Sequence, residues 1–299
     1  MKIKSRWLRI ILRSLIILVS GFIVLCFVFD RVIELRATDQ QYKDFFAKNH
    51  VPGEIRYYNS NNRRIRYLSI GDDSLPVLLF IHGSPSSTNL YTDYYKDSVF
   101  LRTFKMLAVD RPGYGFSGLG QAEPSIEKQA QMIMPILDSM KRLHKKIIIM
   151  GESYGTSVAC RIAMDHPCLI SGLVLVGPSL APGEEKIYWV TPLIESPLLN
   201  WFIPRIFQSA NTEKINHKKE LEKMLPLWPK INIPVLYLQG ANDHLIYTSN
   251  ANFAKSHLIN TPLLRVIFFK NRTHFIARNE HSAIRQSILD MLQIISEKG

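Results

Sequence analysis

The sequence predicts an α/β fold in which helices flank a mostly parallel sheet, behind one apolar helix at the amino end. Three observations support this. Continuous apolar runs typical of buried strands alternate with segments whose apolar residues have helical spacing. The segment Gly151-Glu-Ser-Tyr-Gly155 joins one such run directly to a helical segment. An uncharged stretch, Ser14 to Phe29, precedes the whole pattern.

The uncharged stretch is long enough to consider as a membrane span. As a helix it measures about 24 Å, slightly short of a hydrocarbon core of roughly 30 Å. Arg9 and Arg13 can extend it by reaching the head groups. We predict an uncleaved single-pass anchor over residues 1–36, with a cytoplasmic amino end and the rest outside, which in a bacterium is the periplasm. The alternative is a cleaved signal peptide, although Cys-Phe-Val-Phe before Asp30 offers no small-residue cleavage site.

The charge of the chain is concentrated at its amino end. The 299 residues carry a formal net charge of +12. Five positive charges precede the apolar stretch: Lys2, Lys4, Arg6, Arg9 and Arg13. The remainder lacks a concentrated basic face with interleaved aromatic residues, so nucleic acid is not an expected partner. The basic amino end suits anionic lipid, which makes the membrane the expected partner of this segment.

The three cysteines do not make a disulfide framework. Cys26 lies within the apolar stretch, and we expect Cys160 and Cys168 to be small buried hydrophobic residues. The sequence has no metal-ligand spacing, nucleotide-binding loop or flavin motif, so neither a metal nor a cofactor is expected. It makes no prediction of oligomeric state.

The first elements after the anchor are a polar segment and a hairpin. Residues 37–53 are mildly helical and are expected to form a stalk or to cover the core. Alternating apolar residues then predict strands at Glu54–Tyr58 and Arg64–Ile70, joined by a turn at Asn59–Asn62.

Six buried strands follow, separated by helices. The apolar runs are Pro76–Ile81, Phe104–Val109, Ile147–Met150, Leu169–Val176, Ile233–Gln239 and Leu264–Phe269. Helices are expected at Ser125–Leu143, directly after Ser153, and at Glu280–Ser296. Strands that alternate with helices imply a parallel sheet with right-handed crossovers.

One insertion interrupts this alternation. Residues 181–230 are rich in proline and hold three of the four tryptophans. We expect them to form a helical cap over the strand ends, inserted into a core of residues 54–180 and 231–299. The apolar residues of the cap either pack on the core or present an outer face to the bilayer, and both interpretations stay open.

The segment around Ser153 is typical of a nucleophile elbow. In such a turn only small residues fit two positions to either side of the serine, and Gly151 and Gly155 meet this demand. The turn raises the hydroxyl clear of the sheet. It also places the backbone N–H of Tyr154 at a helix N-terminus, where it can stabilise an oxyanion. By itself the motif is weak, since chance produces it in roughly one chain in ten of this length.

A second observation is independent of the elbow. In a parallel sheet, functional groups gather beyond the carboxyl ends of the strands. Asp243 closely follows the strand at Ile233–Gln239, and His274 closely follows the strand at Leu264–Phe269. The chain order Ser153, Asp243, His274 is the order that accompanies this elbow.

Other candidates for these roles are weaker. His82 is better interpreted as a structural loop histidine, and His244 as an exposed or entrance residue. Asp110 could serve as the acid, but an Asp-Arg-Pro-Gly turn usually anchors its own loop. Glu152 is unusual beside a nucleophile, and the sequence gives no physical account of it.

With these motifs in order, the chain resembles the α/β-hydrolase superfamily over Glu54 to Ser296. The motifs are His82-Gly83-Ser84-Pro85, Asp110-Arg-Pro-Gly-Tyr-Gly115, the elbow, and the loops bearing Asp243 and His274. It is similar to the capped branch that includes epoxide hydrolases and haloalkane dehalogenases. Those enzymes carry an aspartate where this chain has Ser153, so acyl transfer is favoured over epoxide or halide chemistry.

The resemblance implies a role for each residue. Ser153 would attack a carbonyl, His274 would accept and return its proton, and Asp243 would orient the imidazole. The oxyanion hole would come from the backbone N–H groups of Tyr154 and Ser84.

We therefore expect a membrane-anchored serine hydrolase that cleaves carboxylic esters of apolar or lipid-like substrates. Three alternatives stay open. One is an aminopeptidase-like enzyme in which Glu184, Glu185 or Glu195 holds the substrate amine. Another is hydrolysis of a carbon–carbon bond by the same triad. The third is a binding protein that keeps the fold without turnover.

Overall fold

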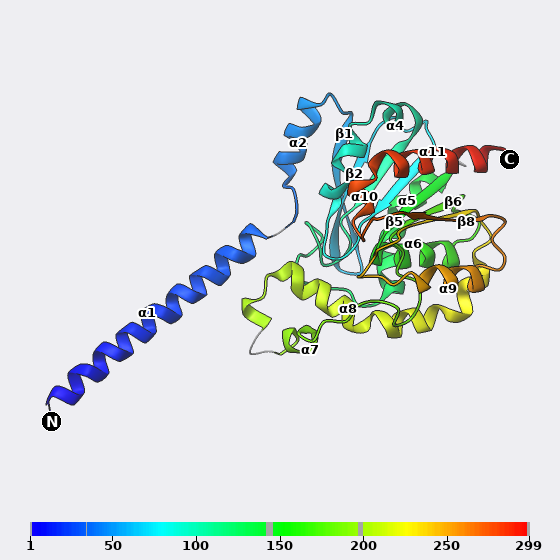
Figure 1. The fold of residues 1–299 in the computed structure, drawn as a ribbon. Helices are drawn as coiled ribbons and strands as arrows, with labels where there is room; N and C mark the ends of the chain where they lie inside the picture. Colours follow the sequence, from blue (N-terminus) through cyan, green and yellow to red (C-terminus); the bar gives the residue numbers. More distant parts are fainter. Residues whose placement is uncertain (1, 34, 142–145, 197–199, 298–299) are drawn as a thin grey trace.

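The computed structural model describes residues 2–33, 35–141, 146–196 and 200–297. Within them it forms an eight-stranded sheet with the order β1-β2-β4-β3-β5-β6-β7-β8. The strands are β1 (Gly53–Ser60), β2 (Arg63–Ile70), β3 (Val77–Ile81), β4 (Lys105–Val109), β5 (Ile147–Glu152), β6 (Gly172–Val176), β7 (Val235–Gly240) and β8 (Leu264–Phe269). β2 pairs antiparallel with β1 and β4, and the other pairs are parallel. The predicted mostly parallel α/β fold is confirmed (Figure 1).

Helices cover both faces of this sheet. The α-helices are α1 (Lys2–Val32), α2 (Asp39–Lys48), α3 (Thr92–Tyr95), α4 (Ser98–Thr103), α5 (Ile126–Lys141), α6 (Tyr154–Asp165), α7 (Thr191–Ile194), α8 (Arg205–Met224), α9 (Ser249–His257), α10 (Ile276–Asn279) and α11 (His281–Glu297). The 3₁₀ helices are η1 (Thr88–Tyr91), η2 (Asn200–Phe202) and η3 (Leu225–Lys230). The helix expected at Ser125–Leu143 corresponds to α5, and its expected end at Leu143 lies outside the described residues.

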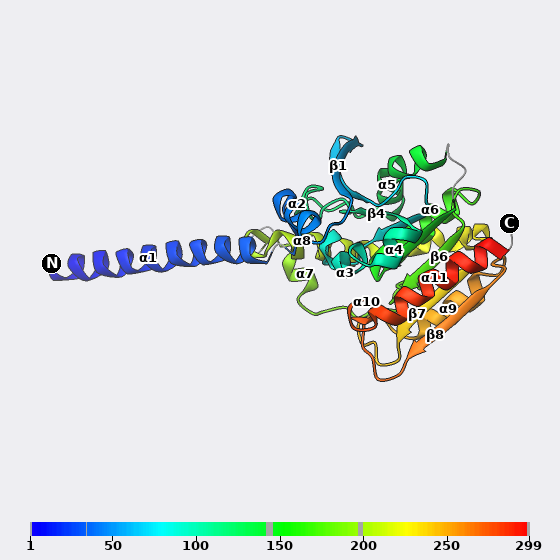
Figure 2. The ribbon, with the colours of Figure 1, turned by 90° about the horizontal axis from the view of Figure 1, so that it is seen from above.

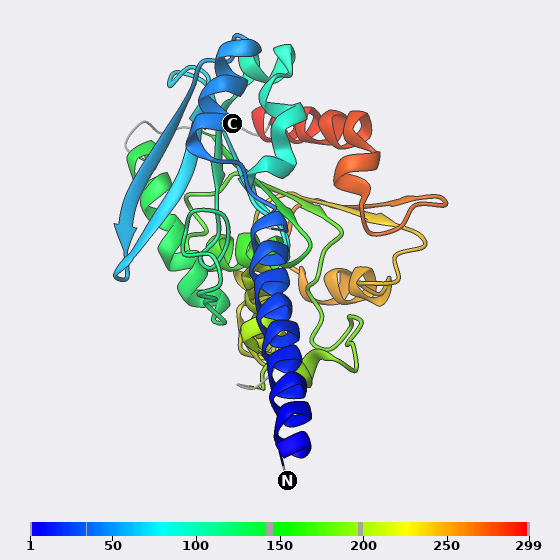
Figure 3. The ribbon, with the colours of Figure 1, turned by 90° about the vertical axis from the view of Figure 1, so that its left-hand side faces the viewer.

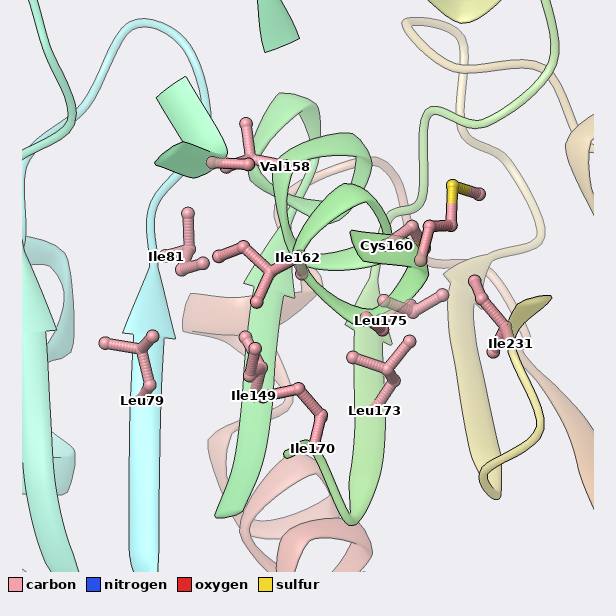
Figure 4. Packing of buried hydrophobic residues seen from close by; sticks show 14 of the residues in the cluster. Leu79, Ile81, Ile149, Val158, Cys160, Ile162, Ile170, Leu173, Leu175 and Ile231 are labelled. Carbon is pink, nitrogen blue, oxygen red and sulfur yellow. The ribbon is translucent and has the colours of Figure 1, made fainter. Parts of the chain in front are cut away.

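Strand β3 shows why the sheet needs a cover on both faces. Leu79 and Ile81 join a buried cluster with α5, α6 and α9, while Leu78 and Phe80 join a second cluster with α3, α4 and α11. Figure 4 shows Leu79 and Ile81 beside Ile162 of α6. Alternate side chains of a strand point to opposite faces, and burying each one stabilises the fold by roughly 1.5–3 kcal/mol. A continuously apolar run is therefore stable only between two layers of helices.

The hairpin is tighter than its sequence predicted. β1 and β2 pair along their whole length, from Gly53 opposite Ile70 to Ser60 opposite Arg63. Only Asn61 and Asn62 remain as the loop, with φ of 48° and 58°. Asparagine tolerates these left-handed angles, which a two-residue turn of type I′ requires at both positions. The wider turn predicted at 59–62 is wrong because the strands continue into it.

Helix α2 lies against the core. Thr38 and Gln41 form a capping box at its start, and Tyr42 and Phe46 are buried on its inner face. The Tyr42 hydroxyl lies 2.9 Å from Thr88 Oγ1. In the described structure, this part of the segment 37–53 therefore covers the sheet.

Helix α1 extends away from the α/β body, as Figures 1, 2 and 3 show from three sides. Residues Arg6–Val32 make one helix long and apolar enough to cross a membrane, and none of its tested window is buried. Its inner end contacts the inserted segment: Asp30 accepts hydrogen bonds from the backbone N–H and the guanidinium of Arg205. The ring of Phe22 packs edge-on against Trp201. By length and composition this helix fits either a membrane anchor or a signal sequence.

From Thr191 onward the described part of the inserted segment is mainly helical, with α7, η2, α8 and η3 in chain order, while residues 181–190 form turns and a single bridge from Glu185 to Ile246. The longest of these helices, α8, carries an inward stripe at helical spacing that includes Ile206, Glu213, His217 and Leu221. The stripe is partly polar, and its charged members reach the functional site described below.

The two cysteines after Ser153 differ in environment. Cys160 lies on α6 and is buried, as predicted. Cys168 is exposed, so its predicted burial is wrong. It falls in the turn between α6 and β6, and turns lie at the surface because their backbone groups need water.

Candidate active site

The turn between β5 and α6 has the geometry of a strained elbow. Ser153 has φ of 49° and ψ of −123°, outside the regions that non-glycine residues usually adopt. A Cβ atom on Gly151 would lie 2.8 Å from the carbonyl oxygen of Gly155. A Cβ atom on Gly155 would lie closer still to the carbonyl oxygen of Ile81. Both positions therefore require glycine for steric reasons.

Three side chains from distant parts of the chain meet at this turn. His274 Nε2 lies 2.9 Å from Ser153 Oγ, and His274 Nδ1 lies 2.7 Å from Asp243 Oδ2. Asp243 comes from the loop after β7, and His274 comes from the loop after β8. The carboxyl ends of parallel strands share one edge of the sheet, which explains the convergence.

The surroundings of Asp243 decide where the imidazole proton lies. Burial alone would raise the pKa of Asp243, but hydrogen bonds from His274 and from the backbone N–H groups of Ile246 and Leu245 outweigh it, so the pKa is lowered. Both backbone donors lie 2.9 Å from Asp243 Oδ1. An ionised carboxylate only accepts hydrogen bonds, so Nδ1 of His274 carries the proton. In the neutral ring Nε2 is then free to accept from the Ser153 hydroxyl.

The loop after β3 is fixed opposite the elbow. The backbone N–H of Arg111 donates to His82 Nε2 at 3.0 Å, so Nδ1 of His82 donates to the carbonyl of Gly83 at 2.8 Å. Burial and the nearby Arg111 charge lower the pKa of His82 well below its ordinary value. A Cβ atom on Gly83 would lie 3.0 Å from Ser153 Cβ. The loop carrying Ser84 thus lies directly against the nucleophile turn.

A buried ion pair ties this loop to helix α8. Arg111 donates to the carbonyl oxygens of His82 and Gly83, at 2.7 and 2.9 Å. The same guanidinium binds both carboxylate oxygens of Glu213, at 2.5 and 3.2 Å. Arg111 and Glu213 have no solvent exposure. Tyr114 completes the link, because its hydroxyl donates to Glu213 at 2.6 Å and lies 2.7 Å from Ser84 Oγ.

The weaker candidates from the sequence have other surroundings. Asp110 is fully buried and accepts from Arg66 Nε at 2.8 Å and from the backbone N–H of Thr88 at 3.0 Å. It therefore organises the loops around β2, β4 and η1. His244 is exposed and does not line the cavity beside Ser153.

A second hydrogen-bonded series of a serine, a histidine and a carboxylate, which we call the second string, begins at Ser157, one helical turn beyond the elbow. Ser157 Oγ lies 3.1 Å from His217 Nε2, and His217 Nδ1 lies 2.9 Å from Glu185 Oε1. All three are buried. The Ser157 hydroxyl donates its hydrogen to the carbonyl of Ser179 at 2.5 Å. In the contact with His217, Nε2 is therefore the donor and the Ser157 oxygen is the acceptor. Lys214 binds the other oxygen of Glu185 at 2.6 Å.

Ser153 and His274 open into a cavity of about 610 Å³. Its wall is largely apolar and combines the inserted segment, the loops of the sheet and the end of α1. Representative members are Phe29, Leu90, Val190, Ile203, Phe207 and Phe275. Lys214 and Glu185 also line it. A mostly apolar cavity with a few polar groups is typical of a small-molecule site.

Glu152 lines the same cavity, next to the nucleophile. It is 8% exposed, and its Oε2 atom has no hydrogen-bond partner among the described residues. Burial raises its pKa to about 7, although the His274 charge and the backbone N–H of Gly83 act in the opposite direction.

Sequence reasoning missed Glu213, His217 and the role of Arg111. A signal did exist for the first two, because they fall on the inward stripe of α8 at helical spacing with Ile206 and Leu221. A charged residue on such a stripe needs a buried partner. The identity of that partner depends on tertiary structure.

A protein-family model and several known proteins are similar to parts of this chain. The family model described as serine aminopeptidase, S33, matches residues 73–224. A monoacylglycerol lipase, abhd6-B, from Xenopus laevis is 28% identical over 200 residues, which are 64% of this chain and 56% of that protein. A 1-acylglycerol-3-phosphate O-acyltransferase from Arabidopsis thaliana is 26% identical over 152 residues, 47% of this chain and 35% of that protein. The chain thus spans only about a third to a half of these relatives.

Among solved structures, a membrane phospholipase A described as a bacterial virulence factor matches with a TM-score of 0.67. The match covers 98% of this chain and 99% of the other at 17% identity, so it bears on the fold alone. The family model spans half of the chain, and the relatives include lipases. The chain belongs to the α/β-hydrolase superfamily.

Proposed function

We propose that this protein is a membrane-anchored serine hydrolase that cleaves carboxylic esters with an apolar or lipid-like part. The observation that carries the proposal is the hydrogen-bonded series Ser153–His274–Asp243, which opens into an apolar cavity. The strained elbow at Ser153 supports the same role, because strain of this kind is found where a side chain must be presented for reaction.

The reaction has two stages. Ser153 Oγ attacks the ester carbonyl while its proton passes to His274 Nε2, which gives a tetrahedral intermediate and an imidazolium that Asp243 stabilises. The intermediate collapses to an acyl-enzyme, and the leaving alcohol takes the proton from Nε2. Water then attacks the acyl group by the same steps, releases the carboxylic acid and restores Ser153.

The oxyanion would be held by two backbone N–H groups. Tyr154 is the first residue of α6, so its N–H lies at the positive end of a helix. Ser84 belongs to the loop that packs against the elbow, and Arg111 holds that loop through two carbonyl oxygens. Losing one such donor typically costs about 3 kcal/mol of transition-state stabilisation.

The proposed substrate class follows from the walls of the cavity. Aliphatic and aromatic side chains such as Ile203 and Phe207 surround the reacting groups, so a long apolar group is favoured over a sugar or a nucleotide. Two relatives are named as a monoacylglycerol lipase and as a 1-acylglycerol-3-phosphate O-acyltransferase, and the acyl glycerols in these names agree with this class.

Two features support membrane association. Helix α1 is long and apolar enough to span a bilayer, and its Phe29 lines the cavity beside Ser153. The inserted segment also exposes large apolar side chains, including Tyr188, Trp189 at 84% exposure and Trp201, and the Trp201 ring packs against Phe22 of α1. Tyrosine and tryptophan are enriched at the level of lipid head groups. We therefore place the cavity entrance at the membrane surface, with the catalytic part on the outer side.

An aminopeptidase-like activity is the second candidate, favoured by the description of the matching family model. Its amine holder would have to be an acidic group at the cavity. Glu185 lies there, but Lys214 and His217 already bind both of its oxygens. Glu184 accepts from Ser249, and Glu195 is exposed. None of the three glutamates that the sequence offered as amine holders is therefore free at the cavity, and on this ground ester hydrolysis is the better supported reaction.

A substrate panel tests the choice. Purified full-length protein in detergent is incubated with short- and medium-chain esters and with aminoacyl amides, alongside the Ser153→Ala variant. We expect hydrolysis of the esters that disappears in Ser153→Ala. Unchanged hydrolysis by this variant contradicts the mechanism, and hydrolysis of the amides alone favours the aminopeptidase.

A further inference from the structure

One polar group of the cavity has no part in the mechanism above. Glu152 precedes the nucleophile, lines the cavity and is more than nine-tenths buried. Its Oε2 atom makes no hydrogen bond within the described part of the chain. A buried carboxyl oxygen without a donor costs free energy, so its presence needs an explanation.

The groups around Glu152 do not supply the missing donor. Tyr94, a neighbour from α3, gives its hydroxyl hydrogen to the carbonyl of Ala277 at 3.2 Å. The hydroxyl of Tyr91, a neighbour from η1, has no hydrogen-bond partner among the described residues. His274 uses its two ring nitrogens on Ser153 and Asp243. The backbone N–H of Gly83 acts on the carboxyl group but leaves Oε2 unsatisfied.

A purely structural role does not account for this arrangement. Two structural carboxylates near the site are saturated: Asp110 accepts four hydrogen bonds, and Glu213 binds Arg111, Tyr114 and Gln129. Glu152 alone among the carboxylates that line this cavity has a buried oxygen without a partner in the described structure. Its free oxygen is a hydrogen-bond acceptor on a residue that lines the cavity next to Ser153.

We propose that Glu152 forms a polar subsite that accepts a hydrogen bond from a hydroxyl or ammonium group of the substrate near its ester bond. The cavity then divides into an apolar part for the hydrocarbon chain and one acceptor at its base. This inference rests on the proposed ester hydrolysis and goes beyond it, because it assigns the specificity of that reaction to one residue. An ester of glycerol or of an amino alcohol fits the subsite, and a simple alkyl ester leaves Glu152 unsatisfied.

Three esters of one fatty acid test the subsite: the glycerol monoester, the 2-(dimethylamino)ethyl ester and the propyl ester. They supply a hydroxyl donor, an ammonium donor and no donor. The ratio of kcat/KM for each donor ester to kcat/KM for the propyl ester is measured for full-length protein in detergent. Glu152→Leu removes the acceptor, and Glu152→Gln removes only the charge. Glu195→Gln, an exposed glutamate of the inserted segment, is the matched control.

We expect both ratios to fall about tenfold or more in Glu152→Leu, since a hydrogen bond to a charged group is lost. In Glu152→Gln the ammonium ratio should fall as far, while the glycerol ratio falls less because the amide oxygen still accepts. Glu195→Gln should match the wild type. These outcomes together support the subsite.

A pH series sharpens the test. In wild type the ammonium ratio should rise between pH 6 and pH 8 as Glu152 ionises, and in Glu152→Gln it should stay level. The groups that face Glu152 are His274, Tyr91 and Tyr94. Burial raises the pKa of both tyrosines above this range, so neither tyrosine ionises across it.

One result overturns the inference alone: ratios that stay unchanged in Glu152→Leu. If kcat/KM also falls equally for all three esters, the role of Glu152 is structural. A wild-type protein that hydrolyses none of the esters overturns the proposed function as well, so the two failures are distinguishable.

Discussion

The described part of the molecule contains two hydrogen-bonded strings of a serine, a histidine and a carboxylate, and they differ in ways that bear on function. Ser153–His274–Asp243 lies on a strained elbow and opens into the cavity. In Ser157–His217–Glu185, Ser157 lies one turn further along α6, His217 lies on α8, and all three residues are buried. Both strings have hydrogen-bonding distances suited to proton transfer. Residue types and distances therefore do not distinguish a reactive serine from a structural one.

The two strings differ in the group that receives the serine hydroxyl hydrogen and in whether the serine opens into the cavity. Ser157 donates its hydrogen to the carbonyl of Ser179, so it has none to give to His217. Lys214 shares the acid of the second string, which makes Glu185 part of an ion pair. His217 also packs on the ring of Tyr154, with the ring centroids 4.5 Å apart. The second string thus holds the inserted segment to the elbow helix, while the first is available for chemistry.

The largest expected effect separates the two histidines. In His274→Ala, ester hydrolysis should fall by about 10⁴-fold or more, because the general base is lost. In His217→Ala it should fall less than about tenfold, with a lower melting temperature because buried hydrogen bonds are lost. Steady-state kinetics and thermal melting of full-length protein check both. A 10⁴-fold loss in His217→Ala with an unchanged melting temperature would make the second string catalytic.

The next effect concerns how the inserted segment holds the loop after β3, which carries Ser84. Glu213→Ala leaves the Arg111 charge buried without its partner, which should cost about 3–5 kcal/mol of stability. Because Arg111 also holds the carbonyls of His82 and Gly83, kcat should fall more than KM rises. Glu222→Ala, an exposed site on the same helix, is the control. Equal stability of the two variants in chemical denaturation would contradict a stabilising role for the ion pair between Arg111 and Glu213.

The acid of the second string should give a smaller effect that depends on pH. Burial would raise the pKa of Glu185, but the charges of His217 and Lys214 outweigh it and lower the pKa from 4.5 to about 2. A folded-state pKa below the unfolded value means that the stabilisation is present above about pH 4.5 and is lost as the pH falls towards 2. The difference corresponds to roughly 3 kcal/mol.

Glu185→Gln should therefore be less stable than wild type at pH 6, and the gap should narrow as the pH approaches 2. Thermal melting of both proteins across this range measures the gap, and Glu184→Gln at the neighbouring position serves as the control. A stability difference between the two proteins that does not change with pH would show that the Glu185 charge does not stabilise its contact with His217 and Lys214.

The sequence predicted most of the fold because its signals are local. Continuous apolar runs such as Val77–Ile81 require cover on both faces, and a serine between two glycines requires a sharp turn. The positions of Asp243 and His274 followed from topology, since strand ends share one edge of the sheet. The structure brings these two side chains together with Ser153, while their catalytic roles stay predictions.

What the sequence missed depends on contacts between distant segments. Arg111 and Glu213 are far apart in the chain, and the sequence around each residue does not indicate its ion-pair partner. The environment of Glu152 likewise depends on burial by η1, α3 and the loop after β3. Hairpin length and the exposure of Cys168 were mispredicted because each depends on where an element ends, which one or two residues decide.

The most direct test of the central claim is covalent labelling with a fluorophosphonate probe, which reacts with activated serines. Full-length protein in detergent is compared with Ser153→Ala, His274→Ala and Ser157→Ala, and the labelled residue is located by peptide mass spectrometry. We expect the label on Ser153 in wild type and in Ser157→Ala, and no label in Ser153→Ala or His274→Ala. A label on Ser157, or undiminished labelling of Ser153→Ala, would contradict the assignment of Ser153 as the nucleophile.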